Sequence, residues 1–166
     1  MVAAGAVGIA TASDGAGSIR IPAACCGLPG FKPTHGTMAG SGGWFGMSTQ
    51  GCLTRSLVDA AVYLDTFGSF GESLQRATDT PPARLRIGVT LAGSAAVRMR
   101  PVDAEVSNAL RQAADTLAAA GHDVRDVELR FGVAAKSLSV RYLGGIRASA
   151  NSVDDPTRLQ RCLGQP

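Results

Sequence analysis

A serine flanked by small residues is the side chain of this sequence best suited to chemistry. Residues 13–23 read SDGAGSIRIPA, and Ser18 follows Gly15, Ala16 and Gly17. A serine hydroxyl becomes a good nucleophile only when a base removes its proton, and acyl transfer also needs N–H donors for the developing oxyanion. Residues as small as Gly15, Ala16 and Gly17 let their backbone amides approach a substrate carbonyl closely. The segment therefore suggests acyl transfer at Ser18, with an ordinary Gly/Ser loop or a helix N-cap as the alternative.

A base for this serine is harder to find in the sequence. The nucleophile-elbow pattern GxSxG is not matched, because Arg20 occupies its last position. A Ser-His-Asp triad would have to use His35 or His122. We expect His122 on the surface, between a helix and a strand, whereas His35 lies in a loop that could approach Ser18. The spacing does not require a triad with either histidine, because triads are defined by geometry.

Composition and charge exclude several classes of protein. The 166 residues are 45% apolar and 17% charged, with a net charge of +3, which indicates one globular domain. Lys and Arg are scattered without interleaved aromatic residues, so nucleic acid is not an expected partner. No apolar run approaches the roughly 18 residues of a membrane span, and the N-terminal stretch lacks the basic region of a signal peptide.

Cysteine usage points to a reducing compartment. The chain has four cysteines without CxxC spacing, which are Cys25, Cys26, Cys52 and Cys162. This pattern indicates neither a metal site nor a disulfide framework, and we expect a cytoplasmic protein. Cys25 and Cys26 are expected to be small buried residues.

The periodicity of apolar residues predicts an α/β protein. A helix is expected over 56–67, with Ser56 as N-cap and Asp59 completing a box-like pair. The first 67 residues are otherwise rich in Gly and Ser, and residues 68–84 are predicted to be a linker loop.

The second half of the chain predicts a βαβ unit over 85–129. Alternating apolar residues indicate strands over 84–90 and 122–129, and helical spacing indicates a helix over 103–120 with Asp103 as its N-cap. Short connections between them favour a parallel strand pair. Residues 130–166 form a weakly defined tail that includes a candidate helix over 134–146.

Two longer stretches resemble the amidase signature family. The first, SDGAGSIRIPAACCGLPGFKPTHGTM, resembles the family's glycine-rich Asp-x-Gly-Gly-Ser-Ile-Arg-x-Pro segment and its following Gly-x-Lys-Pro-Thr-x-Gly turn. The second, GCLTRSLVDAAVYLDTF, resembles the family's Gly-Pro-x-Thr-Arg-Ser-x-x-Asp entry into a helix. The matched positions are Asp14, Gly17, Ser18, Ile19, Arg20, Pro22, Gly27, Gly30, Lys32, Pro33, Thr34, Gly36, Gly51, Thr54, Arg55, Ser56 and Asp59.

The resemblance implies a fold and a reaction. The family fold is an α/β/α sandwich around a mixed sheet, and its members hydrolyse a carboxamide to an acid plus ammonia or an amine with a Ser-Ser-Lys triad. By resemblance Ser18 is the nucleophile, and the amides of Gly15, Ala16 and Gly17 form the oxyanion hole. Ala16 stands where the family has glycine, so a positive φ there would be strained. No metal or cofactor is implied.

Two further residues of the segment are expected to organise the loop. Arg20 is expected to anchor it through charge-assisted hydrogen bonds to Asp14, and Asp14 is more typical of a loop organiser than of an acid catalyst.

The family's lysine and bridging serine precede this segment. Here only AAGAV lies in front of it, which resembles the tail of a helix, so we expect a chain truncated at the N-terminus and also at the C-terminus. Lys32 matches the structural turn of the family, and Lys136 matches no motif, so neither is expected to replace the missing base. We therefore expect amide turnover by residues 1–166 near background.

Two alternatives stay open. The chain could be a non-catalytic fragment or partner subunit that associates, for example as a homodimer, through an exposed sheet edge. It could also belong to the amidotransferase branch of the same family, which passes ammonia to an acylated tRNA, but the weak and unclustered charge does not support this. Trp44, Phe45 and Met47 either line an acyl pocket or cover the core.

Overall fold

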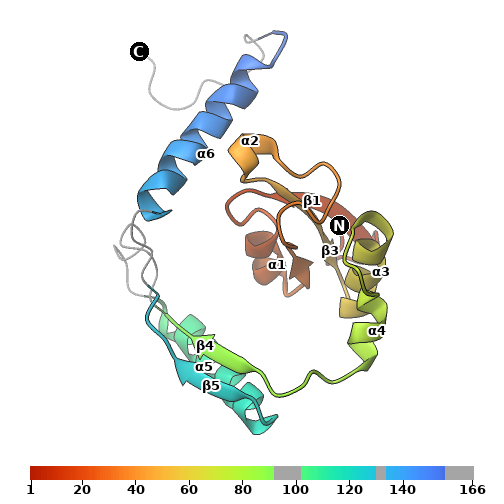
Figure 1. Cartoon of the computed structure of the whole chain (residues 1–166), viewed down its shortest axis with the longest axis vertical. Helices are drawn as coiled ribbons and strands as arrows, with labels where there is room; N and C mark the ends of the chain where they lie inside the picture. The colour runs from red at the N-terminus through yellow and green to blue at the C-terminus, as the bar shows by residue number, and fades with distance from the viewer. Residues whose placement is uncertain (92–101, 130–133, 156–166) are drawn as a thin grey trace. The chain divides into compact units, whose positions relative to one another are not determined.

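The computed structural model describes residues 1–91, 102–129 and 134–155 (Figure 1). The chain divides into two compact units, one of Met1–Thr80 with Ser139–Pro166 and the other of Pro81–Leu138. Cys162 and the end of the predicted tail lie outside the described residues. Within the described residues, no helix has the length and apolar character needed to cross a membrane.

The first unit is built on a three-stranded antiparallel sheet. Strands β1 (Ile9–Asp14) and β2 (Gly30–Phe31) both pair with β3 (Thr49–Thr54), which gives the order β1-β3-β2. Helix α1 (Arg20–Cys26) follows β1, and the short turn α2 (Gly43–Gly46) precedes β3. The register places Asp14 opposite Thr49, so the end of β1 lies beside the start of β3.

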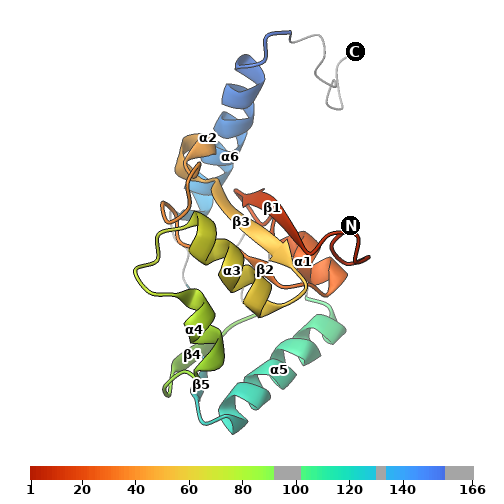
Figure 2. The same cartoon turned by 90° about the vertical axis from the view of Figure 1, so that its right-hand side faces the viewer.

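Both faces of β3 are covered, as in an α/β/α arrangement. Successive strand residues point to opposite faces. Helix α3 (Leu57–Phe67) lies beside β3 (Figure 2), and Cys52 packs on that side against its buried residues. On the other side, a Cβ added at Gly51 would lie only 2.8 Å from the Cδ1 atom of Ile19, the residue that precedes α1. The carbonyl oxygen of Phe31 on β2 lies closer still to such a Cβ, and together with Ile19 it explains why glycine suits position 51.

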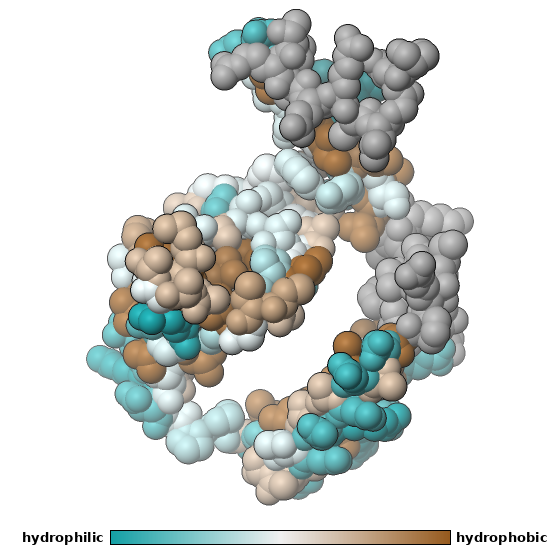
Figure 3. Space-filling view, turned by 180° about the vertical axis from the view of Figure 1, so that it is seen from behind, coloured by the Kyte–Doolittle hydropathy of each residue, from teal (hydrophilic) through white to brown (hydrophobic). Residues whose placement is uncertain are grey.

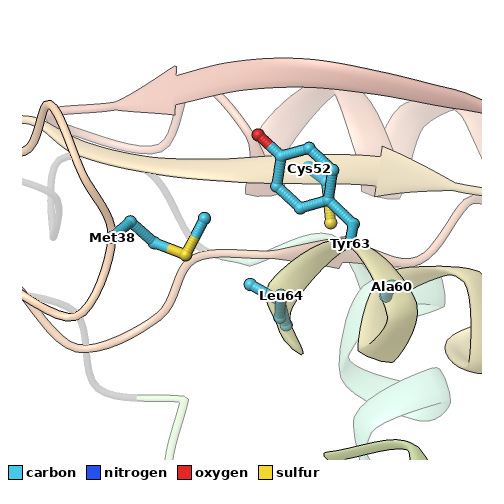
Figure 4. Close-up of a cluster of buried hydrophobic side chains, with 5 residues drawn as sticks. All are labelled: Met38, Cys52, Ala60, Tyr63 and Leu64. Atoms are coloured by element: carbon cyan, nitrogen blue, oxygen red, sulfur yellow. The ribbon is translucent and has the colours of Figure 1, made fainter. Parts of the chain in front are cut away.

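The predicted helix over 56–67 is confirmed as α3. Ser56 is its N-cap, accepting a hydrogen bond from the Asp59 amide at 3.1 Å and donating one to the Asp59 carboxylate at 2.8 Å. Its buried face joins a cluster of apolar side chains (Figure 4) made of Met38, Cys52, Ala60, Tyr63 and Leu64. Burial raises the pKa of the Cys52 thiol to about 11, so this cysteine remains a neutral core residue.

Two expectations about the first unit are wrong. The segment 68–84 is not entirely loop, because it contains helix α4 (Leu74–Asp79). The Asp65 carboxylate accepts hydrogen bonds from the amides of Leu74 and Gln75 at 2.8 and 3.1 Å, and so caps a helix that local propensity did not reveal. Cys25 and Cys26 are exposed rather than buried, because Ala23 provides the buried face of the short helix α1.

The second unit contains the predicted βαβ arrangement. Strands β4 (Arg86–Val89) and β5 (Asp123–Asp126) are parallel, and α5 (Ala104–Ala119) lies between them in sequence. Asp103 caps α5 by accepting a hydrogen bond from the Glu105 amide at 2.8 Å, as predicted. The described residues therefore contain both antiparallel and parallel strands, in two separate sheets.

The candidate helix after residue 134 is also present and is longer than expected. Helix α6 spans Ala134–Asn151, and its residues from Ser139 onward belong to the first unit. There it meets the turn α2 through an edge-to-face contact of Tyr142 with Trp44, whose ring centroids are 5.2 Å apart.

Candidate active site

The loop between β1 and α1 is organised by one buried carboxylate. Asp14, which is 1% exposed, accepts hydrogen bonds from the amides of Gly17 at 2.5 Å and Ile19 at 3.3 Å. It also receives two bonds from the Arg20 guanidinium, from Nε at 2.9 Å and Nη2 at 3.0 Å. Four donors thus converge on one side chain within six residues of sequence, which fixes the turn that carries Ser18.

The charge of Asp14 is stabilised despite its burial. The hydrogen bonds from Arg20, followed by those from the Gly17 and Ile19 amides, hold the pKa of this carboxyl well below its usual range, whereas burial opposes them. The Arg20 side chain remains 56% exposed, and its pKa is raised by the same contact. Asp14 is therefore an ionised acceptor, and it has no proton to donate as an acid catalyst near neutral pH.

Gly17 is the residue of the loop that needs to be glycine. Its φ of 123° lies in a region that side-chain-bearing residues rarely adopt, and an added Cβ would lie 2.7 Å from the Ile21 Cδ1 atom. Ala16 does not have a positive φ, so the strain considered from the sequence does not arise there. At Gly15 an added Cβ would lie 3.3 Å from Cε3 of Trp44, so a side chain would fit there only if the indole shifted slightly.

The predicted nucleophile lies at the surface beside unused amides. Ser18 is exposed, and no described residue forms a hydrogen bond with its hydroxyl. Among the described residues, no acceptor is bonded to the amides of Gly15, Ala16 or Ser18. The Gly17 amide is different, because it is buried and donates to Asp14. Of the three amides predicted to form an oxyanion hole, that of Gly17 therefore already has an acceptor, whereas those of Gly15 and Ala16 do not.

No described side chain is hydrogen-bonded to the Ser18 hydroxyl as a base would be. The Lys32 ammonium donates a hydrogen bond to the Pro33 carbonyl at 2.6 Å. The His35 Nδ1 atom contacts the Thr49 hydroxyl at 3.5 Å, and the His122 Nδ1 atom accepts a bond from the Leu85 amide at 3.3 Å. In the described part of the chain, each of these possible bases is thus recorded with a partner other than Ser18.

One feature of the site could not be found from the sequence. Trp44 and Phe45 have φ values of 56° and 52°, so two bulky residues in succession adopt the left-handed conformation. The Trp44 ring lies against Gly15 at the start of the Ser18 loop. The only available signal was the run of glycines around these aromatic residues, which predicts an unusual backbone without saying where it packs.

Other parts of the described structure do not offer comparable chemistry. A cavity of about 240 Å³ in the second unit is lined by apolar residues and by both acidic and basic side chains, Asp115 and Arg111 among them, without a nucleophile. Among the described residues, no group of three His, Cys, Asp or Glu side chains could hold a metal ion.

Comparison with known proteins identifies most of the chain as part of an amidase. The Amidase family profile matches residues 1–155. AmiB2 of Mycobacterium tuberculosis is 37% identical over 168 residues, which cover 96% of this chain and 36% of that protein.

Two solved structures extend the likeness to the fold. The structure of 6-aminohexanoate cyclic dimer hydrolase complexed with substrate gives a TM-score of 0.73 at 26% identity, covering 93% of this chain and 37% of that one. The crystal structure of a bacterial aryl acylamidase of the amidase signature family gives a TM-score of 0.74 at 26% identity. The match covers 90% of this chain and 33% of that one.

The fold is therefore the α/β fold of the amidase signature enzymes. The chain belongs to the amidase family. It spans about a third of the length of the proteins that it matches.

Proposed function

We propose that this chain carries the nucleophile loop of an enzyme that hydrolyses a linear carboxamide, with Ser18 as the nucleophile. The observation that carries the proposal is the exposed Ser18 hydroxyl beside the unpaired amides of Gly15, Ala16 and Ser18. Asp14 and Arg20 hold this loop in place. Membership of the amidase family supports amide hydrolysis as the reaction.

The proposed reaction has two stages. The Ser18 oxygen forms a bond to the amide carbonyl carbon, the hydroxyl proton passes through a base to the leaving nitrogen, and the C–N bond breaks. Water then cleaves the resulting serine ester to release the acid, with its proton returning to Ser18. The free amides of the loop stabilise the negative oxygen in both stages.

The base is the part of this mechanism that the described residues do not provide. By its resemblance to the family, the proton of Ser18 would pass through a bridging serine to a neutral lysine. The Lys32 ammonium is hydrogen-bonded to the Pro33 carbonyl. Lys32 also matches the lysine of the family's Gly-x-Lys-Pro-Thr-x-Gly turn, which is structural. We therefore propose that Ser18 of residues 1–166 can form a tetrahedral adduct with a suitable ligand, but that these residues alone hydrolyse amides near the background rate.

Phenylboronic acid tests the proposed nucleophile without requiring turnover. Its boron forms a bond with the Ser18 oxygen, and the hydroxyl proton goes to solvent, so that a tetrahedral boronate mimics the negatively charged intermediate. Trp44 is the single tryptophan and its ring lies against Gly15, so its fluorescence reports binding. We expect saturable binding that is lost in Ser18→Ala and kept in Ser13→Ala, a matched exposed serine on β1.

Hydrolysis of 4-nitroacetanilide tests the proposed lack of turnover. We expect equal, near-background release of 4-nitroaniline from the wild-type chain and from Ser18→Ala. Turnover that Ser18→Ala abolishes would show that this chain has its own base. Boronate binding that is the same in wild type and Ser18→Ala would rule out Ser18 as the nucleophile.

A second candidate function is association with another chain. Among the described strands, β1 pairs on one side only, with β3. Figure 3 shows hydrophobic residues gathered on the surface of the first unit. The exposed apolar residues of this unit include Ile9, on β1, and Ile21, on α1. An open edge of this kind favours strand pairing between copies. Light scattering after gel filtration at two concentrations would test it, and a monomer at both would exclude a homodimer.

The cysteines support a reducing compartment for the protein, and we propose the cytoplasm. Cys25 and Cys26 are exposed free thiols on the same short helix, and Cys52 is a buried free thiol. Exposed thiols persist where the surroundings keep them reduced. Thiol titration of the native protein under nitrogen should detect Cys25 and Cys26 and leave Cys52 unreactive until the chain unfolds.

A further inference from the structure

The strained turn at Trp44 is held by hydrogen bonds within its own loop and by packing against distant residues. The left-handed conformation is unfavourable for a residue with a bulky side chain, and Trp44 and Phe45 both adopt it. The loop closes on itself through hydrogen bonds from the Gly42 amide to the Ser48 carbonyl and from the Ser48 amide to the Gly43 carbonyl, each 3.0 Å long. Such strain persists where packing fixes the local structure, and it is concentrated at functional sites.

One side of Trp44 faces the loop of the proposed nucleophile. A Cβ added at Gly15 would lie 3.3 Å from Cε3 and 3.7 Å from Cζ3 of the indole. Gly15 directly follows Asp14, and its amide is one of the unpaired donors beside Ser18. The position of the indole therefore limits where this amide can lie.

The other side of Trp44 faces α6. Its ring meets the Tyr142 ring edge to face, at an interplanar angle of 83°. A Cβ added at Gly145 would lie 2.8 Å from Cβ of Trp44, and one added at Gly144 would lie 2.9 Å from Cε2 of Phe45. Figures 1 and 2 both place α2 beside α6. Two adjacent glycines weaken a helix, and here they allow α6 to approach the strained turn.

We propose that Trp44 is a positioning residue for the oxyanion-binding amide of Gly15, and that Tyr142 of α6 sets its position. The inference rests on the proposed function of the Ser18 loop. In this proposal the ring of Tyr142 links α6 to the Ser18 loop, although Tyr142 lies more than a hundred residues after Ser18 in the sequence. A residue in this role changes the affinity for a tetrahedral adduct as well as the packing around it.

The test uses phenylboronic acid and the fluorescence of Trp44 in the full chain. We expect Tyr142→Ala to raise acrylamide quenching of Trp44 and to weaken Ser18-dependent boronate binding about tenfold, within the usual range of coupling between sites. Tyr142→Phe keeps the ring contact and should restore wild-type affinity. Phe67→Ala is the matched control, since it removes another aromatic contact of the same unit, that of Phe67 with Tyr63, away from the Ser18 loop.

The possible outcomes separate the two proposals. Binding that depends on Ser18 but is equal in Tyr142→Ala, Tyr142→Phe and wild type would overturn the role of Trp44 and leave the nucleophile in place. Binding that does not depend on Ser18 would overturn the proposed function and this inference with it. If circular dichroism shows that Tyr142→Ala is unfolded, Tyr142→Leu keeps apolar volume without a ring and provides the same comparison.

Discussion

The two loops that meet at Gly15 are stabilised in opposite ways. In the Ser18 loop, the partners of the Asp14 carboxylate are Gly17, Ile19 and Arg20, all within six residues. In the loop over 40–48, the strained Trp44 has its ring contacts with Gly15 and Tyr142, which lie far away in the sequence.

This difference separates local from tertiary control of conformation. A short-range network forms whenever the right residues are spaced correctly, because the ends of the loop are already close together. A strained turn that depends on distant contacts forms only when the rest of the unit is folded. We therefore expect substitutions in the Ser18 loop to have large and direct effects, and substitutions at the α6 contact to have smaller effects that spread to both loops.

The largest expected effect is the loss of the Asp14 carboxylate. Asp14→Ala leaves the buried Gly17 amide and the Arg20 guanidinium without their acceptor. Leaving a buried donor without its acceptor costs about 1–3 kcal/mol, and the Ile19 amide loses its bond as well, so we expect the free energy of unfolding to fall by about 3 kcal/mol. Urea denaturation followed by Trp44 fluorescence measures this value for the first unit.

The second unit contains a matched control for Asp14. Asp123 also receives two bonds from an arginine, Arg125, at 2.9 and 2.8 Å, but the Arg125 side chain is 75% exposed. Asp123→Ala should therefore cost much less stability than Asp14→Ala, because exposed ion pairs contribute little. Circular dichroism measures the loss, because Trp44 lies in the other unit. Equal losses in the two variants would mean that burial does not distinguish the two pairs.

The next largest effect is expected at Gly17. Gly17→Ala would place a side chain on backbone with a φ of 123° and push the new Cβ toward Ile21. The conformational strain should cost about 2 kcal/mol and also displace the Asp14 contact. Gly36→Ala is the control, since Gly36 also has a positive φ, of 87°, but has open space around it. If both variants lose the same stability, the specific geometry of the Ser18 loop is unimportant.

The same contrast explains what the sequence could predict. Helix α3 with its Ser56–Asp59 cap, the βαβ unit and the Asp14–Arg20 contact all follow from residues close together in sequence. The occupied Gly17 amide was missed because glycine patterns indicate which amides can approach a ligand but not which are already bonded.

Tertiary contacts account for the other differences from prediction. Helix α4 depends on Asp65, nine residues before Leu74, and the exposure of Cys25 and Cys26 depends on which face of α1 packs. The left-handed Trp44 packs against Tyr142 and Gly145 of α6. In each case the contact lies outside the short stretch of sequence from which helix or strand propensity is estimated.

A smaller effect is expected where α6 meets the strained turn. Gly145→Ala places a Cβ 2.8 Å from Cβ of Trp44, and the clash outweighs the gain in helix propensity. We expect a net loss of about 1.5 kcal/mol and a shift of the Trp44 emission maximum. Ser149→Ala, at an exposed position of the same helix, should change neither. An unchanged emission maximum in Gly145→Ala would show that α6 does not control the environment of Trp44.

The smallest effect concerns pH and again distinguishes the Asp14 network from the rest of the unit. The pKa of Asp14 is lowered in the folded chain from its ordinary value of 3.8, so its stabilisation is complete above that value. Below it, the unfolded chain takes up a proton that the folded loop excludes, and stability is lost as the pH falls. The stability difference between wild type and Asp14→Asn should therefore be about 1 kcal/mol smaller at pH 3 than at pH 7. Urea midpoints of both proteins at the two pH values give this difference directly, because the other carboxylates contribute equally to each. A difference that stays constant would mean that Asp14 titrates alike in the folded and unfolded chains, and the buried carboxylate would then not be the ionised centre of the loop.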